Sequence, residues 1–277
     1  MTPSEAWSYD GKRVVVTGGG GSGMGAAAVA ELADLGAEVH VFDLREPAGE
    51  VESFQRVDLK DPDAIAAAVE AVPGTIDALF NCVGVPGPPF VSDLDTMLIN
   101  FAGVRHLTEL VVERMPAGGA VATIASAAAA GWPQRLEAFL PLVETQGFAG
   151  AKGWCEAHPD AIATGYGPSK LAVAIWTAYA CNDLGARGIR INCTMPGPTE
   201  TPMLPSFKQR VGEGFWESYP IPIGRFATPA EQGRALVFLN SAAASCITGI
   251  GLVTDGGSLS AAAAGVVTLP TVQVRTG

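Results

Sequence analysis

A tyrosine and a lysine four residues apart are the pair in this sequence best placed to do acid–base chemistry. They are Tyr166 and Lys170, in the stretch "TGYGPSKLAVAIW". A tyrosine alone is a poor base near neutral pH because its reference pKa is about 10, and a nearby ammonium lowers that pKa by favouring the phenolate. Residues i and i+4 share one face of a helix, and Pro168 is tolerated because it falls in the first turn. The spacing therefore indicates a general acid/base pair at the start of a helix.

A glycine-rich stretch, "VVVTGGGGSGMG", begins at Val14. As G-x-G-x-x-G it fits Gly18, Gly20 and Gly23, and it also nearly fits T-G-x-x-x-G-x-G, with one residue too many. It lies between an apolar run and a helical pattern, where glycines let backbone N–H groups approach a pyrophosphate at a helix N-terminus. We expect a dinucleotide site in which Gly18 makes the first turn, the loop is widened by one residue, and Ser22 lies near a phosphate oxygen.

Two carboxylates bear on which dinucleotide binds. Asp43 ends the next apolar run, 20 residues after Gly23, where a carboxylate can bind the adenosine ribose hydroxyls. It would repel a 2′-phosphate, and the glycine stretch has no Lys or Arg, so we expect NAD rather than NADP. Arg45 leaves NADP open as an alternative. Asp58 ends a third run and could accept a hydrogen bond from the adenine amino group.

Short apolar runs that alternate with helical patterns must position these residues. Strands are predicted at Arg13–Thr17, Glu38–Asp43, Ser53–Asp58, Asp77–Asn81, Ala120–Ile124, Ile189–Cys193 and Gly251–Asp255. Helices are predicted at Gly23–Leu35, after Asp61-Pro62, at Leu94–Arg114, at Tyr166–Leu184 and at Pro229–Leu239. The alternation predicts an α/β protein with a single-domain Rossmann fold, a seven-stranded parallel sheet flanked by helices on both faces. Ligands of such sheets bind at the carboxyl ends of the strands.

Composition and net charge limit the classes of partner that the protein can be expected to bind. The 277 residues are 48% hydrophobic and 16% charged, which suits one packed domain over 1–277. The net charge is -11, with no Lys/Arg cluster, so we expect no nucleic-acid or membrane partner. We expect no signal peptide and no membrane span. The five scattered cysteines favour reduced thiols in a cytoplasmic protein, and we expect no metal site.

Nine stretches in order give the chain its resemblance to a known family. They are "TGGGGSGMG", "FD", "VDL", "NCVG", "INFAG", "TIAS", "YGPSK", "RINCTMPGPTETP" and "VTDGG". From about Lys12 to Gly257 the sequence resembles the short-chain dehydrogenase/reductase family. That resemblance implies an oxidoreductase that moves a hydride between an alcohol carbon and a nicotinamide cofactor.

The resemblance also implies roles for four residues. Tyr166 would be the proton donor and acceptor for the substrate oxygen, and Lys170 would lower its pKa and hold the nicotinamide ribose. Ser126 would hydrogen-bond the substrate oxygen. Asn100 would stabilise a water that relays protons through Lys170.

The implied cofactor contacts follow the same motifs. Asn81, Val83 and Gly84 would line the adenosine ribose, and the backbone from Pro196 to Thr199 would meet the carboxamide. The full set is Gly18, Gly20, Gly21, Ser22, Gly23, Met24, Gly25, Asp43, Leu44, Asp58, Leu59, Asn81, Val83, Gly84, Tyr166, Lys170, Pro196, Gly197, Thr199 and Thr201. At Thr199 the family usually has Ile or Val, so the role of that side chain is open.

An insertion at about residues 130–163 separates Ser126 from Tyr166 by more residues than is usual in the family. Its apolar residues Leu136, Phe139, Leu140 and Val143 predict an amphipathic helix that Pro141 would split or kink. The insertion could form a wall of the substrate pocket, make or block a subunit contact, or decorate the surface. It is similar to a subgroup that includes 3α-hydroxysteroid and coniferyl-alcohol dehydrogenases, which implies a steroid-like, apolar or aromatic alcohol or ketone as substrate. The segment Glu200–Tyr219 stands where the family has its flexible substrate loop.

Assembly and function leave alternatives. The apolar helices at 94–114 and 166–184, with a C-terminal tail from about 258, suggest a homodimer or homotetramer. Retention of all four implied catalytic residues favours an enzyme over a catalytically silent dinucleotide-binding regulatory protein. A reductase for another carbonyl class, such as sugar-like or acyl-thioester carbonyls, is the alternative among enzymes.

Overall fold

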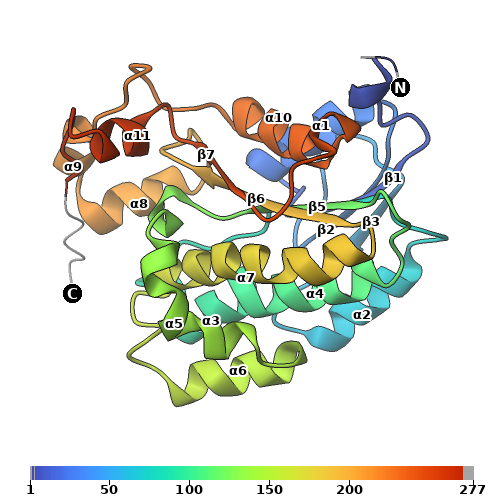
Figure 1. Cartoon of the computed structure of the whole chain (residues 1–277), viewed down its shortest axis with the longest axis horizontal. Coiled ribbons are helices and arrows are strands. Elements are labelled where there is room, and N and C mark those ends of the chain that lie inside the picture. The colour runs from blue at the N-terminus through green and yellow to red at the C-terminus, as the bar shows by residue number, and fades with distance from the viewer. Residues whose placement is uncertain (1, 3, 271–277) are drawn as a thin grey trace.

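A single parallel sheet forms the middle layer of the molecule (Figure 1). The computed structural model describes residues 2 and 4–270. The strand order is β3-β2-β1-β4-β5-β6-β7, and every neighbouring pair is parallel. The order reverses between β1 and β4, so the chain leaves a crevice there for a ligand. The predicted α/β fold with seven parallel strands is confirmed.

The strand bounds differ from the predicted ones mainly at their carboxyl ends. The strands are β1 (Arg13–Thr17), β2 (Glu38–Asp43), β3 (Ser53–Arg56), β4 (Ala78–Asn81), β5 (Ala120–Ile124), β6 (Arg190–Pro196) and β7 (Gly251–Thr254). β3 stops before Asp58 because the ladder with β2 ends at the pair Asp43 and Arg56. β6 continues past Cys193 to Pro196 because β7 goes on pairing with it to Thr254.

Helices α1 (Met24–Asp34) and α10 (Pro229–Asn240) cover one face of the sheet (Figure 1). Thr228 caps α10 with its side chain, which accepts a hydrogen bond from the Glu231 N–H, and the Glu231 carboxylate accepts one in return from the Thr228 N–H. Leu32 and Leu236, from the two helices, are fully buried in one cluster with apolar residues of β1. This face therefore holds the glycine-rich turn against the sheet.

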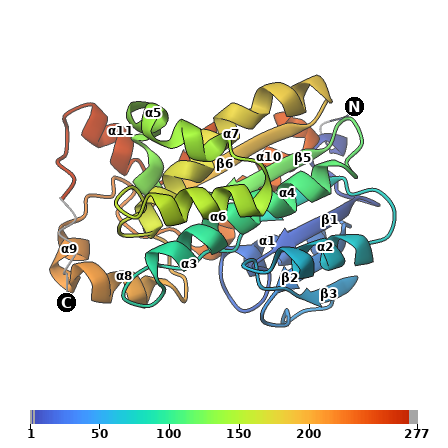
Figure 2. The same cartoon turned by 90° about the horizontal axis from the view of Figure 1, so that it is seen from below.

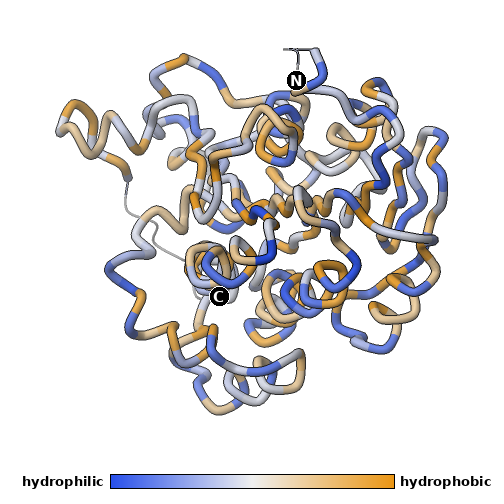
Figure 3. Tube along the Cα trace, turned by 45° about the vertical axis from the view of Figure 1, so that its right-hand side comes forward, coloured by the Kyte–Doolittle hydropathy of each residue, from blue (hydrophilic) through white to orange (hydrophobic). Residues whose placement is uncertain are grey.

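Helices α2 (Pro62–Ala71), α3 (Asp93–Met97), α4 (Val104–Val112) and α7 (Tyr166–Ala186) cover the other face (Figure 2). Asp61 caps α2, as predicted, by accepting hydrogen bonds from the N–H groups of Asp63 and Ala64. In Figure 3 the hydrophobic colour runs along the central strands, and hydrophilic colour is common on the outer turns. The two faces of the sheet thus carry separate apolar clusters.

The predicted long helix Leu94–Arg114 is broken in its middle by a π-helical segment, Leu98–Gly103. Asn100 lies in this segment, and π-bulges occur frequently at functional sites. The Asn100 Oδ1 accepts a hydrogen bond from the Val85 N–H (2.8 Å), and its Nδ2 donates to the Ser169 Oγ (3.1 Å). The apolar spacing of the sequence follows an ordinary helical period on both sides and gives no sign of this turn.

The insertion forms two further helices, α5 (Trp132–Val143) and α6 (Gly147–Ala157), outside α4 and α7 (Figure 1). Pro141 lies inside α5 without splitting it. The buried side chains of α5 are Phe139, Leu142 and Val143, whereas Leu136 is 38% exposed. The predicted apolar face is therefore partly wrong, because the contact with α7 selects Leu142 in place of Leu136.

Arg105 is the polar anchor of the insertion. Its side chain is 1% exposed, and its guanidinium donates to the carbonyls of Leu142 (3.3 Å), Val143 (3.4 Å) and Gly147 (2.6 Å) and to the Thr145 Oγ1 (3.1 Å). A charged donor thus joins the C-terminal end of α5 to the first residue of α6.

An ion pair and burial act on Arg105 in opposite directions. The Arg105 Nε lies 3.2 Å from the Glu109 Oε1. Burial lowers the pKa of Arg105, and the Glu109 carboxylate opposes that change. The pairing lets a cation remain in a nearly dry position.

The insertion covers apolar helix surface that the sequence suggested for contacts between subunits. Trp176 of α7 is 7% exposed, because α5 packs on α7, whereas Tyr179 on the same helix remains 47% exposed. The apolar character of α4 and α7 is therefore largely satisfied within the chain.

The remaining helices are short. α8 (Leu204–Val211) and α9 (Glu213–Ser218) follow β6, and α11 (Ser258–Ala263) follows β7. Single 3-10 turns span Glu5–Trp7, Ala127–Ala129 and Ala242–Ala244. All five cysteines are free thiols. Within residues 2 and 4–270, no helix has the length and apolarity needed to cross a membrane.

The turn between β1 and α1 packs too closely for side chains at particular glycines. A Cβ on Gly25 would lie 2.1 Å from the Gly18 carbonyl oxygen, and a Cβ on Gly20 would lie 2.2 Å from the Arg45 carbonyl oxygen. A Cβ on Gly23, the N-cap of α1, would meet no atom within 4 Å. Gly20 and Gly25 are therefore needed for packing, while Gly23 is free of that constraint.

Replacing Gly25 by alanine should destabilise the fold, and replacing Gly23 should not. Gly25→Ala puts a methyl group into a backbone carbonyl, so we expect a loss of at least about 3 kcal/mol in the free energy of unfolding. Urea unfolding measures both variants. Gly23→Ala, the matched control, should unfold within about 0.5 kcal/mol of the wild type. Equal stability of the two variants would contradict the packing described for this turn.

Removal of the Arg105 guanidinium should loosen the insertion. Arg105→Met leaves buried carbonyls without donors and Glu109 without its partner, so we expect a loss of about 3 kcal/mol in unfolding free energy. Arg135→Met is the control, since Arg135 is exposed on α5. If both variants unfold at the same urea concentration as the wild type, Arg105 does not hold the insertion.

Candidate active site

One cavity of about 890 Å³ opens at the carboxyl ends of the strands. Its walls come from the segments that follow β1, β2, β3, β4, β5 and β6. Cavities of this size accept cofactors and small-molecule ligands. We call the part beside Asp43 the nucleotide end and the part beside Tyr166 the catalytic end.

The glycine-rich turn forms one wall of the nucleotide end. Gly18, Gly20, Gly21, Ser22, Gly23, Met24 and Gly25 all line the cavity. The N-terminus of the 11-residue helix α1 faces this wall, with Gly23 as its N-cap and no side-chain hydrogen bond on its first N–H groups. Free backbone donors at a positive helix end, beside a glycine whose missing side chain leaves open space, fit a pyrophosphate.

Asp43 ties the glycine turn to the end of β2. Its Oδ2 accepts a hydrogen bond from the Gly20 N–H (2.8 Å), and its Oδ1 accepts one from the Arg45 N–H (3.0 Å). An ionised carboxylate has about four lone-pair sites, so both oxygens keep room for further donors. The residue fits the ribose position predicted for it and also supports the turn itself.

Arg45 comes closer to the glycine turn than its sequence position indicates. A Cβ placed on Gly21 would lie 4.0 Å from the Arg45 Nη1, and Arg45 lines the cavity. The glycine stretch itself has no Lys or Arg, but the fold brings Arg45, the residue that left NADP open, to this turn from the next loop.

The other adenine-side residues lie along the same edge of the cavity. Leu44, Asp58, Leu59, Val83 and Gly84 line it. The Asp58 Oδ1 accepts a hydrogen bond from the Lys60 N–H (2.9 Å). Leu44 is 53% exposed, so its side chain is open to contact from a ligand.

Asn81 does not lie where the resemblance put it. Its side chain is 1% exposed, does not line the cavity, and donates through Nδ2 to the hydroxyls of Thr108 (2.9 Å) and Thr123 (3.2 Å). It links β4, β5 and α4 behind the cavity. A ribose contact by the Asn81 side chain is thus not supported, and its position is that of a core residue.

Ser126 and Tyr166 meet at the catalytic end. Both line the cavity, and the Ser126 side chain is close enough to the phenol to influence its pKa. Burial raises the pKa of Tyr166, while the Ser126 side chain and the positive charge of Arg210 lower it.

Lys170 lies one turn along α7 from Tyr166 but points past it. Its Nζ donates to the Ile124 carbonyl oxygen (2.7 Å) and lies 5.8 Å from the centre of the Tyr166 ring. Burial lowers the pKa of Lys170 to about 8. A Cβ on Gly84 would lie 3.5 Å from the Lys170 Nζ and 3.7 Å from the Asn100 Oδ1. Lys170 and Asn100 are thus buried beneath the cavity floor, one small residue away from it.

Four predicted contacts at and after the end of β6 also lie at the cavity: Pro196, Gly197, Thr199 and Thr201. The Thr199 Oγ1 donates to the Gly197 carbonyl (3.0 Å) and accepts from the Gln232 Nε2 (3.4 Å). Thr199 is 7% exposed, so its hydroxyl supports the loop and has little surface for a ligand.

An aromatic wall stands opposite Ser126 and Tyr166. It comes from α8, α9 and the residue after α9, and consists of Phe207, Phe215, Trp216 and Tyr219. The Phe207 ring meets the Tyr166 ring edge to face, with centroids 4.9 Å apart. Leu269 and Pro270 of the C-terminal tail also line this cavity, while the tail beyond Pro270 lies outside the described residues. The segment expected to carry the substrate loop does lie over the cavity.

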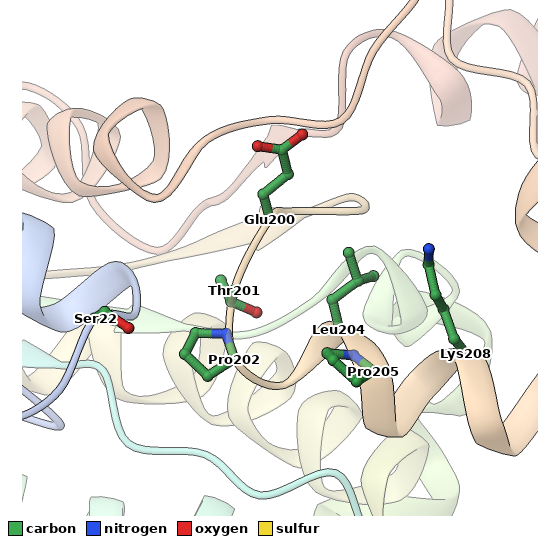
Figure 4. A pocket seen from close by; sticks show the side chains of 7 residues that line it. All are labelled: Ser22, Glu200, Thr201, Pro202, Leu204, Pro205 and Lys208. Atoms are coloured by element: carbon green, nitrogen blue, oxygen red, sulfur yellow. The ribbon is translucent and has the colours of Figure 1, made fainter.

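A smaller cavity of about 420 Å³ lies between Ser22 and the segment from Glu200 to Lys208 (Figure 4). Ser22 lines both cavities, so it stands where the glycine turn faces the start of α8. The contact of Ser22 with a phosphate oxygen remains a prediction.

The insertion does not reach the site. None of the described residues that line either cavity lies within 130–163. Of the three roles left open by the sequence, a wall of the pocket is therefore not supported. The two helices instead cover α4 and α7.

Arg210 is the site residue that the sequence analysis missed. It lies on α8 and lines the cavity beside Tyr166. The signal was available in principle, because Phe207 and Arg210 are three residues apart and so share a helix face. Nothing in the sequence, however, shows which partner that face meets.

Two family models match the chain. A short chain dehydrogenase model matches residues 12–136, and a model described as enoyl-(acyl carrier protein) reductase matches residues 157–258. The residues between the two matches fall inside the insertion. Coniferyl-alcohol dehydrogenase of a Pseudomonas species is 32% identical over 90% of this chain and 97% of its own length.

Solved structures agree with these matches. The 3α-hydroxysteroid dehydrogenase of Pseudomonas sp. B-0831, complexed with NADH, has a TM-score of 0.75 and 29% identity over 93% of this chain and 100% of its own. A short chain dehydrogenase of Burkholderia cenocepacia, in complex with NADP, has a TM-score of 0.71 and 26% identity over 91% of this chain and 99% of its own.

The sequence similarity extends over nearly the whole chain, and both halves match family models. The chain has the seven-stranded parallel sheet, with the glycine turn and the Ser126–Tyr166 pair at one cavity. It belongs to the short-chain dehydrogenase/reductase family.

Proposed function

We propose that this alcohol/carbonyl dehydrogenase uses NAD to interconvert an apolar ring alcohol and its ketone or aldehyde. Tyr166 is its general acid/base. The observation that carries the proposal is the single cavity, which has Asp43 and the glycine turn at one end and Ser126, Tyr166 and an aromatic wall at the other.

The reaction follows from the hydroxyl pair. NAD, when bound, supplies the acceptor for the hydride that leaves the alcohol carbon. Tyr166 as phenolate accepts the alcohol proton in oxidation, and as phenol it donates that proton to the carbonyl oxygen in reduction. Ser126 donates a hydrogen bond to the same substrate oxygen and orients it.

Lys170 and Asn100 act below the cavity floor. The Lys170 ammonium, with its pKa of about 8, is mostly charged at neutral pH and favours the phenolate. Asn100 has its side-chain oxygen next to Lys170 across Gly84 and would hold a water that carries the proton onward. Both roles are proposals that rest on this adjacency and on the family resemblance.

The preference for NAD rests on Asp43. A carboxylate fixed at the ribose position accepts from hydroxyl groups and repels a 2′-phosphate. Arg45, which the fold brings to the same turn, acts in the opposite direction and would permit some use of NADP. The relatives leave the choice open, since one solved neighbour holds NADH and another holds NADP.

The aromatic wall supports the substrate class. Four rings and several aliphatic side chains face Tyr166 across the cavity, which favours a flat or alicyclic apolar substrate. The relatives named for coniferyl alcohol and for a 3α-hydroxysteroid both act on ring-bearing alcohols. Acyl thioesters would need more cationic groups at the cavity than Arg45 and Arg210, the two that line it among the described residues.

We also propose a cytoplasmic homodimer or homotetramer. The five free thiols support a reducing compartment. β7 is an edge strand of the sheet, and Ile250 and Val253 beside it are 39% and 40% exposed, which supports contact with a second copy there. The covered faces of α4 and α7 are less suited to such contact.

Tyr166→Phe should abolish turnover while NAD still binds. Loss of the phenol removes the acid/base group, so kcat should fall by roughly 10³-fold, and the Kd for NAD should stay within about twofold. Absorbance of the reduced nicotinamide, followed with a panel of steroid and phenylpropanoid alcohols, gives the rate.

Tyr179→Phe, on the exposed face of the same helix, is the control and should match the wild type. Turnover retained in Tyr166→Phe removes Tyr166 from the mechanism. A wild type that binds NAD and turns over no alcohol or ketone of a broad panel is instead a silent dinucleotide-binding protein.

Asp43→Asn should shift the cofactor preference towards NADP. The amide keeps an acceptor for the Gly20 N–H but loses the repulsion of a phosphate, so the ratio of kcat/KM for NAD over NADP should fall by roughly 10-fold or more. Parallel assays with both cofactors measure it. Glu46→Gln removes an exposed carboxylate three residues on and should leave the ratio as it is. An unchanged ratio in Asp43→Asn would place cofactor selection elsewhere.

A further inference from the structure

Helix α8 presents two side chains to the catalytic tyrosine from across the cavity. Phe207 packs edge to face on the Tyr166 ring, and Arg210, one turn later on the same face, also lines the cavity. The helix thus contacts Tyr166 through Phe207 and brings a cation to the same cavity.

The Arg210 guanidinium joins α8 to two separate backbone segments. Its Nη1 donates to the Pro86 carbonyl (3.0 Å), and its Nη2 donates to the Thr164 carbonyl (3.0 Å). Pro86 follows β4, and Thr164 lies two residues before Tyr166. A planar guanidinium is suited to such a two-point contact, which an ammonium would not reproduce.

The Thr164 carbonyl belongs to a strained turn. Thr164 has φ 75°, the one positive value at a non-glycine residue in the part of the chain that the structure describes, and Gly165 follows with φ 56°. Backbone strain of this kind persists where the surrounding structure holds it. The same carbonyl accepts the Tyr166 N–H (2.6 Å), so Arg210 binds the peptide group that sets the start of α7.

The loop after β4 also packs closely against this turn, at Gly87. A Cβ on Gly87 would lie 3.2 Å from the Thr164 carbonyl oxygen and 3.3 Å from the Tyr166 nitrogen. The turn is therefore enclosed by the loop after β4, by α3 at Gly165 and by the Arg210 side chain. A shift of α8 removes the last of these supports.

Arg210 is also a charged side chain that lines the cavity at its catalytic end. Among the described residues that line the cavity, the charged ones are Asp43, Arg45 and Asp58 at the nucleotide end and Arg210 at the catalytic end. The Arg210 charge lowers the pKa of Tyr166, against burial.

The other ionisable groups around Tyr166 are Lys170, whose ammonium is bonded to the Ile124 carbonyl, and Asp93, which faces Arg210. Burial lowers the pKa of Arg210, and Asp93 and Tyr166 oppose this. A guanidinium stays charged under such conditions.

We propose that Arg210 is a positioning residue of the reaction: from α8 it clamps the strained turn that presents Tyr166 and places a positive charge beside the phenol. Enclosure of the cavity by α8 is thereby coupled to the alignment and acidity of Tyr166. This inference rests on the proposed function, in which Tyr166 is the acid/base group.

The charge and the clamp are separable by substitution. Arg210→Lys keeps the charge without the two-point contact, Arg210→Gln keeps hydrogen-bond donors without the charge, and Arg210→Met keeps neither. Arg234→Met is the control, since Arg234 lies on the exposed side of α10 and pairs with Glu31 (3.3 Å).

A spectroscopic titration tests the charge without any turnover. The chain has four tyrosines, so protein labelled with 13C at the tyrosine Cζ gives four resonances, and Tyr166→Phe identifies the one from Tyr166. In the NAD-bound protein, we expect the Tyr166 resonance to titrate about one pH unit higher in Arg210→Met and Arg210→Gln than in the wild type. Arg210→Lys should stay closer to the wild type, and Arg234→Met should match it.

Kinetics test the clamp. For alcohol oxidation, kcat at neutral pH should fall by roughly 10-fold in Arg210→Met, with its acid limb moved to higher pH by the same amount as the resonance, while the KM for NAD stays within about twofold. Arg210→Lys should recover the acid limb but not the full kcat at high pH.

Two results overturn the proposal. One is a Tyr166 titration, or an acid limb of kcat, that is the same in Arg210→Met as in the wild type. The other is wild-type behaviour of Arg210→Gln, which would make Arg210 a structural support of α8. If the wild type oxidises no alcohol, the proposed function fails, and the titration still decides the role of Arg210.

Discussion

The contact between Gly25 and the Gly18 carbonyl is the constraint on which the site depends. With no room for a Cβ at that point, the first turn of α1 lies directly against the end of β1. The N–H groups of that turn then face the cavity at the place where the strand order reverses. The nucleotide end exists because two backbones approach more closely than any side chain would allow.

A second set of contacts holds the glycine turn against the end of β2. Asp43 accepts a hydrogen bond from the Gly20 N–H, and Gly20 in turn lies under the Arg45 carbonyl. The carboxylate expected to select the cofactor is therefore also part of the loop's support, so cofactor choice and loop shape are not independent properties of this chain.

Much of the fold could be predicted because strand and helix patterns are local. The apolar runs gave the seven strands to within three residues at each end, and Asp61-Pro62 marked the start of α2. Other features depend on contacts between distant segments. The π-helical turn at Asn100 follows from bonds to Val85 and Ser169, and the buried face of α5 follows from its contact with α7.

The site residues divide in the same way, into those that local motifs predicted and those that depend on contacts between distant segments. Motif order placed Ser126 and Tyr166 at one cavity, but the side chain of Asn81 proved to be a bridge between Thr108 and Thr123. Arg210 lies 44 residues beyond Tyr166, and its spacing from any motif carries no signal. A motif contains the residues that a site shares with its relatives. The role of a side chain outside the motifs, such as Arg210, becomes visible only when its helix, α8, is placed at the cavity.

Arg105 and Arg210 both use their guanidinium groups to bind backbone carbonyls. Arg105 binds carbonyls at the end of α5 and the start of α6, and Arg210 binds the carbonyl at the turn before α7, so each one holds backbone next to a helix end. They differ in exposure and consequence. Arg105 is almost fully buried, pairs with Glu109, and stabilises an insertion that lies away from the cavity. Arg210 lines the cavity together with Tyr166, so the charge that holds the turn also acts on the phenol that we propose as the acid/base group. Because both effects come from one side chain on α8, the proposed role of Arg210 links the position of Tyr166 and the pKa of its phenol to the place of α8 over the cavity.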